Sequence, residues 1–373
     1  MTPPNRIISA VDHVIEPPDI WTQRLAKDKF ADRTPHLERS ADGSDRWIVD
    51  GRKFPLADIA RVGALMNDRV SVPKRWEEIP KAAYDPAARL KAMDDDRIDC
   101  AVLYPSLGGF SGENFGMIGD PDLELACVGA YNDWLIDEWA HASKRFVPQC
   151  LVPLAPVVAT VEEIRRAVGR GHRGVIFPAE PIHLRNLPHL NSEHYDPVWA
   201  ACQDLDVPLC FHAGSAPQLQ FPMAPNLAPE LAAALQSVAR PASAVFDLTN
   251  VLFSRILLRF PKLKVIFAES TIGWGTFLLE YADHQYDQDH CGYELKPSEM
   301  FHRQCYLTTW YDEVKINASH IGVDNILWSA NFPAANSNWP DTQQFASKCL
   351  AGMNDTERRQ ILSANAATLY KID

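Results

Sequence analysis

Three residues that can transfer protons or bind a metal ion each stand at the end of a short apolar run: His13, His212 and Glu269. Imidazole exchanges protons near neutral pH, and both imidazole and carboxylate bind divalent metals. One histidine at such a position is commonly structural, whereas two histidines and a glutamate together predict a reactive site. Asn331 ends another run, and its amide can donate a hydrogen bond to a developing oxyanion.

The apolar runs that would position these residues recur along the chain. They are Ile7–Asp12, Cys100–Ser106, Phe146–Leu154, Arg173–Pro178, Val207–His212, Lys264–Glu269, Gln304–Trp310 and Asn325–Asn331. Most are apolar on both faces, which is typical of parallel strands covered by helices. Helical stretches such as Leu123–Ala142 separate them. This alternation predicts an α/β protein with a (β/α)8 TIM barrel, in which reactive residues follow the strands. An open doubly wound sheet is the alternative, and no G-x-G-x-x-G follows the first strand.

We expect one domain over residues 1–373, with insertions at about 14–90 and 213–250, after the first and fifth strands. The first insertion contains a hairpin pattern, Arg46–Phe54, with Asp50-Gly51 as its turn. Segments that follow barrel strands lie at the catalytic end, so both insertions are expected to shape a substrate pocket. The alternative is a surface elaboration or a subunit contact.

The composition of the chain limits which partners and cellular compartments are expected. The 373 residues carry a net charge of −12, which disfavours nucleic acid and anionic membrane surfaces as partners. Eight cysteines without a C-x-x-C pair indicate reduced thiols. No apolar run approaches 18 residues, and no signal peptide is apparent. A cytoplasmic protein that acts on a small molecule is expected.

Several segments, in their order and spacing, resemble the amidohydrolase superfamily. They are Ser9–Trp21, Tyr131–Trp134, Tyr195–Trp199, Pro208–Gly214, Arg259–Leu263, Phe267–Trp274 and Ile326–Pro333. The resemblance is to the amidohydrolase-related branch that includes aminocarboxymuconate-semialdehyde decarboxylase and the resorcylate decarboxylases. It implies a small-molecule substrate, a homo-oligomer, and one divalent metal, commonly zinc or manganese.

This sequence lacks some of the metal ligands that are typical of that branch, so its metal site is degenerate. The resemblance implies ligands from two alternate residues of the first strand, a histidine on the fifth and an aspartate on the eighth. His13 and His212 are retained, but Val11 replaces the other first-strand ligand, and Asn331 replaces the aspartate. Ala334 stands where a further histidine is common.

Without the anionic ligands, we expect no tightly bound metal. If zinc or manganese is present, His13, His212 and Asn331 are the expected ligands. Two alternatives stay open. A register shift could bring Asp12, which should point to the other face of its strand, into the site, or Glu269 could serve as the missing anion.

In a metal-free site, His13 and His212 would act as general acid and base, Glu269 would orient a histidine or transfer a proton, and Asn331 would stabilise an oxyanion. The substrate-binding candidates are Glu16, Tyr104, Trp274, Trp310 and Phe332. One arginine of the first insertion could pair with a substrate carboxylate: Arg46, Arg52, Arg61 or Arg69.

The predicted function is therefore an acid–base enzyme that acts on a small aromatic or unsaturated carboxylate or lactone, by hydrolysis or a lyase step. One alternative is a metal-dependent decarboxylase or hydrolase with rearranged ligands. The other is a pseudoenzyme that only binds a small molecule.

Overall fold

Eight parallel strands form the centre of the computed structural model, which describes residues 6–66, 71–215 and 226–373. The strands are β1 (Ile8–His13), β5 (Cys100–Tyr104), β6 (Phe146–Cys150), β7 (Gly174–Ile176), β8 (Leu209–His212), β9 (Val265–Ala268), β10 (Cys305–Thr309) and β11 (Ile326–Trp328). They pair in that order, β1-β5-β6-β7-β8-β9-β10-β11. Nearly every strand residue is buried, as expected when both faces of a parallel sheet are covered.

The residues after β11 close the sheet onto β1. The backbone N–H of Asn331 donates to the Val11 carbonyl at 3.0 Å, and the N–H of His13 donates to the Phe332 carbonyl at 2.7 Å. The (β/α)8 barrel predicted from the apolar runs is thereby confirmed, although the strands are shorter than those runs.

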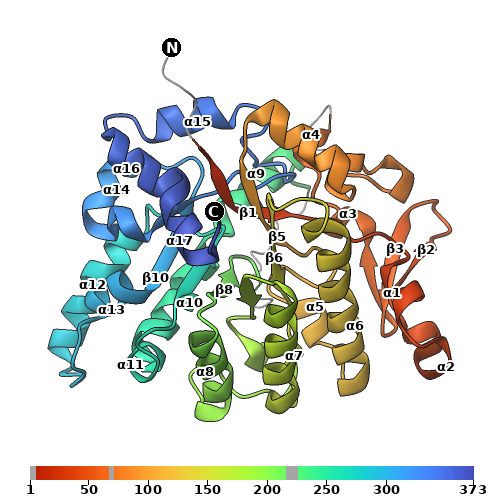
Figure 1. Ribbon diagram of the computed structural model, residues 1–373, viewed down its shortest axis with the longest axis horizontal. Coiled ribbons are helices and arrows are strands. Elements are labelled where there is room, and N and C mark those ends of the chain that lie inside the picture. Colours follow the sequence, from red (N-terminus) through yellow and green to blue (C-terminus); the bar gives the residue numbers. More distant parts are fainter. Residues whose placement is uncertain (1–5, 67–70, 216–225) are drawn as a thin grey trace.

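Helices lie around the strands (Figure 1). The longer helices are α4 (Pro86–Asp96), α6 (Pro121–Trp134), α7 (Val157–Arg170), α8 (Asp196–Asp204), α9 (Pro229–Ala239), α10 (Ala242–Phe253), α12 (Gly275–Gln288), α13 (Pro297–Gln304), α14 (Val314–Ile321) and α15 (Thr342–Cys349). Short helices complete the layer: α1 (Ile20–Arg24), α2 (Lys27–Phe30), α3 (Leu56–Ile59), α5 (Glu113–Gly116), α11 (Ile256–Arg259), α16 (Asp355–Arg359) and α17 (Asn365–Tyr370).

Local sequence sets where the main helices begin. Asp85 caps α4 by accepting a hydrogen bond from the Ala88 N–H at 2.8 Å, and Pro86 occupies the first helical position. Asp120 and Pro121 begin α6 in the same way. No helix in the described segments is long and apolar enough to cross a membrane.

The first insertion contains a three-stranded antiparallel sheet, β2 (His36–Arg39), β3 (Asp45–Val49) and β4 (Arg52–Pro55). The predicted hairpin is present, and both turn residues, Asp50 and Gly51, have positive φ (48° and 76°), as a two-residue hairpin turn requires. Figure 1 shows this sheet beside α1 and α2, at one end of the molecule. The hairpin itself therefore lies to the side of the barrel, and other parts of the insertion approach the strand ends.

Candidate active site

His13 and His212 end strands β1 and β8, and their rings lie together at the carboxyl end of the barrel. The ring centroids are 5.2 Å apart, and both side chains are fully buried. Nδ1 of His212 lies 2.8 Å from the Ala213 carbonyl, and Nδ1 of His13 lies 3.3 Å from the Pro105 carbonyl. A carbonyl oxygen only accepts hydrogen bonds, so the proton of each neutral ring is assigned to Nδ1. Each Nε2 is then left with a free lone pair.

Glu269 directly follows β9 and faces both rings. Its Oε1 lies 3.4 Å from Nε2 of His13 and 3.9 Å from Nε2 of His212. Its backbone φ is +50°, a left-handed conformation that is rare away from glycine. Such strained positions cluster at functional sites. Neither carboxylate oxygen accepts a hydrogen bond from the described residues, although the side chain is 1% exposed.

Burial alone would raise the pKa of Glu269, but the neighbouring His212 and His13 rings and the Arg240 guanidinium outweigh it and lower that pKa to about 2. Glu269 is therefore a carboxylate at neutral pH. Burial also lowers the pKa of His212 to about 4, so this ring is neutral at the same pH.

Two arginines from the two insertions flank the carboxylate. Arg61 Nη1 lies 3.7 Å from Glu269 Oε1, and Arg240 Nη1 lies 3.6 Å from Oε2. Their side chains are 17% and 23% exposed, so they stand between the buried cluster and solvent. The Arg61 guanidinium also lies over the Phe110 ring, 4.4 Å from its centroid. A small carboxylate that enters the barrel would meet both cations.

Among the four arginines considered from the sequence, the structure brings Arg61 to the cluster. Arg46 pairs with Glu38, and Arg52 lies beside the Met117 sulfur. Arg69 lies outside the described residues. Sequence reasoning missed Arg240, because it stands 28 residues after His212 with no local motif around it.

Arg89 and Asp12 form a buried pair beside β1, and Arg89 holds the backbone of His13 by a hydrogen bond. Arg89, on α4, is fully buried and donates from Nη2 to the His13 carbonyl at 2.6 Å and from Nε to the Ala82 carbonyl at 2.7 Å. Asp12 lies 3.9 Å from its Nη1 and accepts hydrogen bonds from Ser9 Oγ and the Phe332 N–H. Asp12 thus points away from the cluster, as the strand alternation predicted, and it does not serve as the missing anion.

Asn331 follows β11 and, like Glu269, has a left-handed backbone (φ +56°). Its Nδ2 donates to Asn336 Oδ1 at 2.8 Å, while its own Oδ1 is buried without a hydrogen bond from the described residues. Glu16, a substrate-binding candidate, accepts hydrogen bonds from the Ser106 and Leu107 N–H groups at 2.9 Å each. That contact ties the end of β1 to the loop after β5.

The four aromatic candidates occupy different places. Tyr104 lies beside both histidine rings, with centroids 6.0 Å from His13 and 5.3 Å from His212. Phe332 lies away from the cluster, under the Arg89 guanidinium. Trp274 is half-buried and donates from Nε1 to the Ser270 carbonyl, and Trp310 is buried against Tyr311. Phe110, a partner of both histidine rings at 5.1 and 5.0 Å, is the aromatic side chain most closely joined to the cluster in these contacts.

The donor set of the cluster suits a divalent metal. One ligand atom each from His13, His212 and Glu269 lies within 4.8 Å of the others, and all three residues are buried. Two imidazole nitrogens and one carboxylate oxygen match the ligand types of catalytic zinc sites. Metal-bound histidines typically donate their second N–H to a carbonyl, as both do here. Glu269 thus fits the role of the anionic ligand that Val11 and Asn331 cannot provide.

Comparisons with known proteins agree with this architecture. An amidohydrolase family model matches residues 78–372. An amidohydrolase structure from Mycobacterium avium subsp. paratuberculosis K-10 superposes with a TM-score of 0.79, at 24% identity over 98% of this chain and 99% of that one. A 2,6-dihydroxybenzoate decarboxylase structure in complex with 2,6-dihydroxybenzoate gives 0.68, at 18% identity over 99% of both chains.

Two further relatives are decarboxylases. A dihydroxybenzoic acid decarboxylase from Polaromonas sp. JS666, with bound manganese and the inhibitor 2-nitroresorcinol, gives a TM-score of 0.67 at 17% identity over 98% of this chain and 97% of that one. The 2-amino-3-carboxymuconate-6-semialdehyde decarboxylase of Dictyostelium discoideum is 23% identical over 213 residues. That match spans 55% of this chain and about half (52%) of the relative's length.

Proposed function

Because the chain belongs to the amidohydrolase family, we propose that the site is that of a decarboxylase-like lyase, with a small aromatic or otherwise unsaturated carboxylate as substrate. The observation that carries the proposal is a buried group of reactive atoms without hydrogen-bond partners among the described residues: Nε2 of His13, Nε2 of His212 and both oxygens of Glu269. Buried polar atoms are nearly always satisfied, so such a group is typical of a site that awaits a ligand. The decarboxylase names among the relatives support the reaction class.

Arg61 and Arg240 account for substrate binding in this proposal. Each lies within 4 Å of Glu269 but beyond hydrogen-bonding distance from it. Guanidinium groups pair strongly with carboxylates, and these two are partly exposed at the mouth of the site. A substrate carboxylate between them would place the adjoining carbon skeleton over the histidine rings and Phe110.

The reaction needs one proton transfer to carbon. The bond between the substrate carbon and its carboxylate breaks, carbon dioxide leaves, and the electron pair stays on the carbon. His13, after taking up a proton at Nε2 from solvent, then delivers it to that carbon, and the Glu269 carboxylate, 3.4 Å from Nε2, stabilises the imidazolium beforehand. His212, which is neutral at neutral pH, lies beside both groups. Asn331 is proposed to stabilise a substrate oxygen that gains negative charge.

A divalent cation would be held by His13, His212 and Glu269. Nε2 of each histidine would then be a ligand, so the proton transfer from an imidazole belongs to the metal-free form of the site. When bound, zinc or manganese supplies Lewis-acid stabilisation of a substrate oxygen. This interpretation differs from the expectation drawn from the sequence, which assigned no tightly bound metal and counted Asn331 as the third ligand.

A metal-free acid–base enzyme is the second candidate, and the two arginines favour it. Arg61 and Arg240 already neutralise the Glu269 charge, and a dication beside them would add further positive charge to a buried site. Hydrolysis of a lactone by the same histidines is compatible with this arrangement.

Turnover and metal content test these proposals together. Purified protein is assayed for carbon dioxide release from 2,6-dihydroxybenzoate and 5-carboxyvanillate, with and without added Mn²⁺ or Zn²⁺. Activity that is lost in His212→Ala and kept in His141→Ala, an exposed-histidine control, supports the site. One bound metal per chain, lost in Glu269→Gln, supports the metal-dependent form. Full activity after chelation supports the metal-free form. Binding of these acids without any turnover, under all metal conditions, would contradict the lyase and favour a pseudoenzyme.

A further inference from the structure

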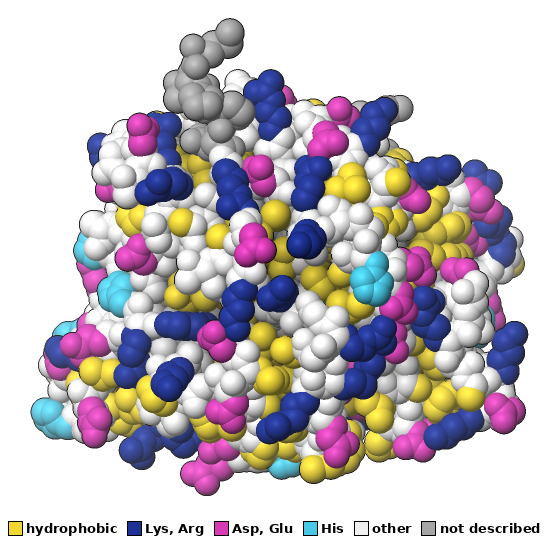
Figure 2. All heavy atoms as spheres, in the orientation of Figure 1, with side chains coloured by type: hydrophobic (Ala, Val, Ile, Leu, Met, Phe, Trp, Pro, Cys, Tyr) yellow, Lys and Arg dark blue, Asp and Glu magenta, His cyan; other side chains and the backbone are white. Residues whose placement is uncertain are grey.

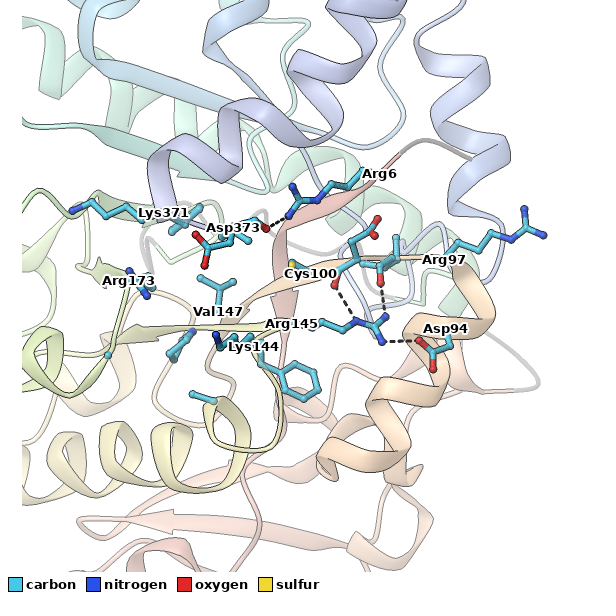
Figure 3. Close-up of a pocket in the computed structure, with 18 residues that line it drawn as sticks. Arg6, Asp94, Arg97, Cys100, Lys144, Arg145, Val147, Arg173, Lys371 and Asp373 are labelled. Carbon is cyan, nitrogen blue, oxygen red and sulfur yellow. Dashed lines mark hydrogen bonds and ion pairs between the residues drawn. The ribbon is translucent and has the colours of Figure 1, made fainter. Parts of the chain in front are cut away.

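A second pocket, of about 900 Å³, lies at the opposite end of the barrel from the histidine cluster. Its lining residues come from segments that lead into strands: Arg6 precedes β1, Asp99 precedes β5, Arg145 precedes β6 and Arg173 precedes β7. His13, by contrast, ends β1. The strands are parallel, so the pocket occupies the amino end of the barrel (Figure 3). It is therefore separate from the proposed active site.

The pocket is positively charged in a chain that carries a net charge of −12. The charged residues that line it are Arg6, Arg97, Lys144, Arg145, Arg173 and Lys371, with Asp94, Asp99 and Asp373. Figure 2 shows several Lys and Arg side chains around the middle of the face on which the C-terminus lies in Figure 1. The charge of the pocket lining is therefore opposite in sign to the net charge of the protein.

Internal contacts engage two of the three aspartates, Asp94 and Asp99, and the Asp373 backbone oxygen accepts a hydrogen bond from Arg6. Asp94 is paired with Arg145 at 2.6 Å, and Asp99 accepts a hydrogen bond from the Ile7 N–H at 2.7 Å. The Lys144 and Arg173 side chains make no ion pair or hydrogen bond within the part of the chain that the structure describes. Both are exposed. Their charge is thus available to a ligand.

Two other cations of the pocket lining, Arg97 and Lys371, lie at helix C-termini, whereas Lys144 and Arg173 do not. Arg97 caps the C-terminus of α4, and Lys371 caps that of α17, where the negative end of the helix dipole attracts a cation. Figure 3 shows these two side chains extending away from the pocket on opposite sides. Lys144 and Arg173 instead lie in the loops that lead into β6 and β7, beyond the helix caps at His141 and Gly171.

The floor of the pocket is apolar. Ile98, Phe146, Val147 and Tyr370 line it, and each is less than 5% exposed. Because little of these side chains is open to solvent, an organic anion would gain mainly by burying its own apolar atoms in the pocket, whereas a bare inorganic anion has none to bury. The volume is in the range of small-molecule sites.

We propose that this pocket binds an organic anion that contains an aromatic ring system and two or more phosphate or carboxylate groups. The charged groups pair with Lys144 and Arg173, and the ring lies on the floor formed by Phe146, Val147 and Tyr370. The proposal does not depend on the reaction assigned to the histidine cluster.

Calorimetric titration of the full chain near physiological salt tests this site. ATP and benzene-1,2,4-tricarboxylate serve as the phosphate and carboxylate probes. Inorganic triphosphate lacks a ring, and adenosine lacks charge. The double variant Lys144→Gln/Arg173→Gln is compared with Lys27→Gln/Lys53→Gln, which removes the same charge from exposed lysines outside the pocket.

At least one organic probe is expected to bind with Kd below about 1 mM. The pocket double variant should weaken that binding about tenfold or more, because it removes both charged contacts to the ligand. The control double variant should leave it unchanged, and Arg61→Gln at the other end of the barrel should leave ATP binding unchanged. Any binding of benzene-1,2,4-tricarboxylate that Arg61→Gln removes belongs to the histidine cluster and not to this pocket. The tighter of the two probes identifies the charged group.

Three results would overturn the proposal. They are absence of binding for both organic probes, equal weakening in the control double variant, and triphosphate affinity equal to that of ATP. The first would leave Lys144 and Arg173 as solvated surface charges, the second would indicate unspecific charge attraction, and the third would mean that the apolar floor plays no part. Because Lys144 and Arg173 are exposed, the double variant should keep the unfolding temperature of the parent protein.

Discussion

Replacing Arg89 by methionine should destabilise the protein by about 3 kcal/mol or more, because a buried guanidinium links three separate segments. Arg89 donates to the His13 and Ala82 carbonyls at 2.6 and 2.7 Å, and it lies over the Phe332 ring at 4.3 Å. Hydrogen bonds from a charged donor contribute about 1.5–3 kcal/mol each, so the loss of two gives roughly 3–6 kcal/mol. Methionine recovers part of this by burying apolar surface at a similar volume. Burial already raises the pKa of Asp12 to about 7, and Arg89, 3.9 Å away, lowers it, so the Asp12 carboxyl group would be protonated at neutral pH once the guanidinium is lost.

Urea unfolding at neutral pH measures the effect, with Arg303→Met as the control. Arg303 also donates to two acceptors, one backbone carbonyl and one amide side chain, but it is half-buried, so water can replace these bonds and its replacement should cost only about 1 kcal/mol. The double variant Asp12→Asn/Arg89→Met should recover little of the loss, since burial keeps Asp12 protonated at neutral pH once Arg89 is gone. A loss below about 1 kcal/mol in Arg89→Met would refute the reasoning, since it would mean that these short hydrogen bonds add no net stability.

Three further predictions concern pH and the site. Burial lowers the pKa of His172 to about 4, so the stability that the neutral ring contributes is present above pH 6.5 and is lost as pH falls towards 4. The difference in unfolding free energy between the parent and His172→Gln, measured by urea unfolding, should therefore change by about 3 kcal/mol from pH 7 to pH 4. A difference that stays constant over this range would contradict the prediction. Glu269→Gln should lower kcat of any identified reaction about 100-fold or more while the chain stays folded by circular dichroism, and near-normal kcat would remove Glu269 from the mechanism. Arg61→Gln and Arg240→Gln should each raise KM for a carboxylate substrate about tenfold with a smaller change in kcat; an unchanged KM in both would exclude them as carboxylate ligands.

The sequence was a reliable guide to the strands and to the residues that end them. Runs that are apolar on both faces appear in the chain itself, and they identified the strand regions and placed His13, His212 and Glu269 at strand ends. The Asp50-Gly51 turn could also be predicted from the sequence, because few pairs of residues accept two positive φ angles.

The chemical character of the site was harder to predict. Comparing individual positions with a family pattern favoured a site without a tightly bound metal, since Val11 and Asn331 cannot replace anionic ligands. The comparison with the family pattern did not consider the backbone of Glu269. This backbone is left-handed, and the Glu269 carboxylate faces two imidazole rings. The family pattern also gave no reason to select Arg61 among the arginines of its insertion, or to consider Arg240 at all.

The sequence by itself thus determined the barrel, its hairpin and the strand-end residues, because apolar periodicity and turn preferences act over a few neighbouring residues. Only the tertiary structure decided which charges meet. Glu269 lies within 4 Å of groups from β1, from β8 and from both insertions, which are up to 256 residues apart in the chain. Electrostatic interactions depend on distances through space, and these are set by how the loops pack over the barrel.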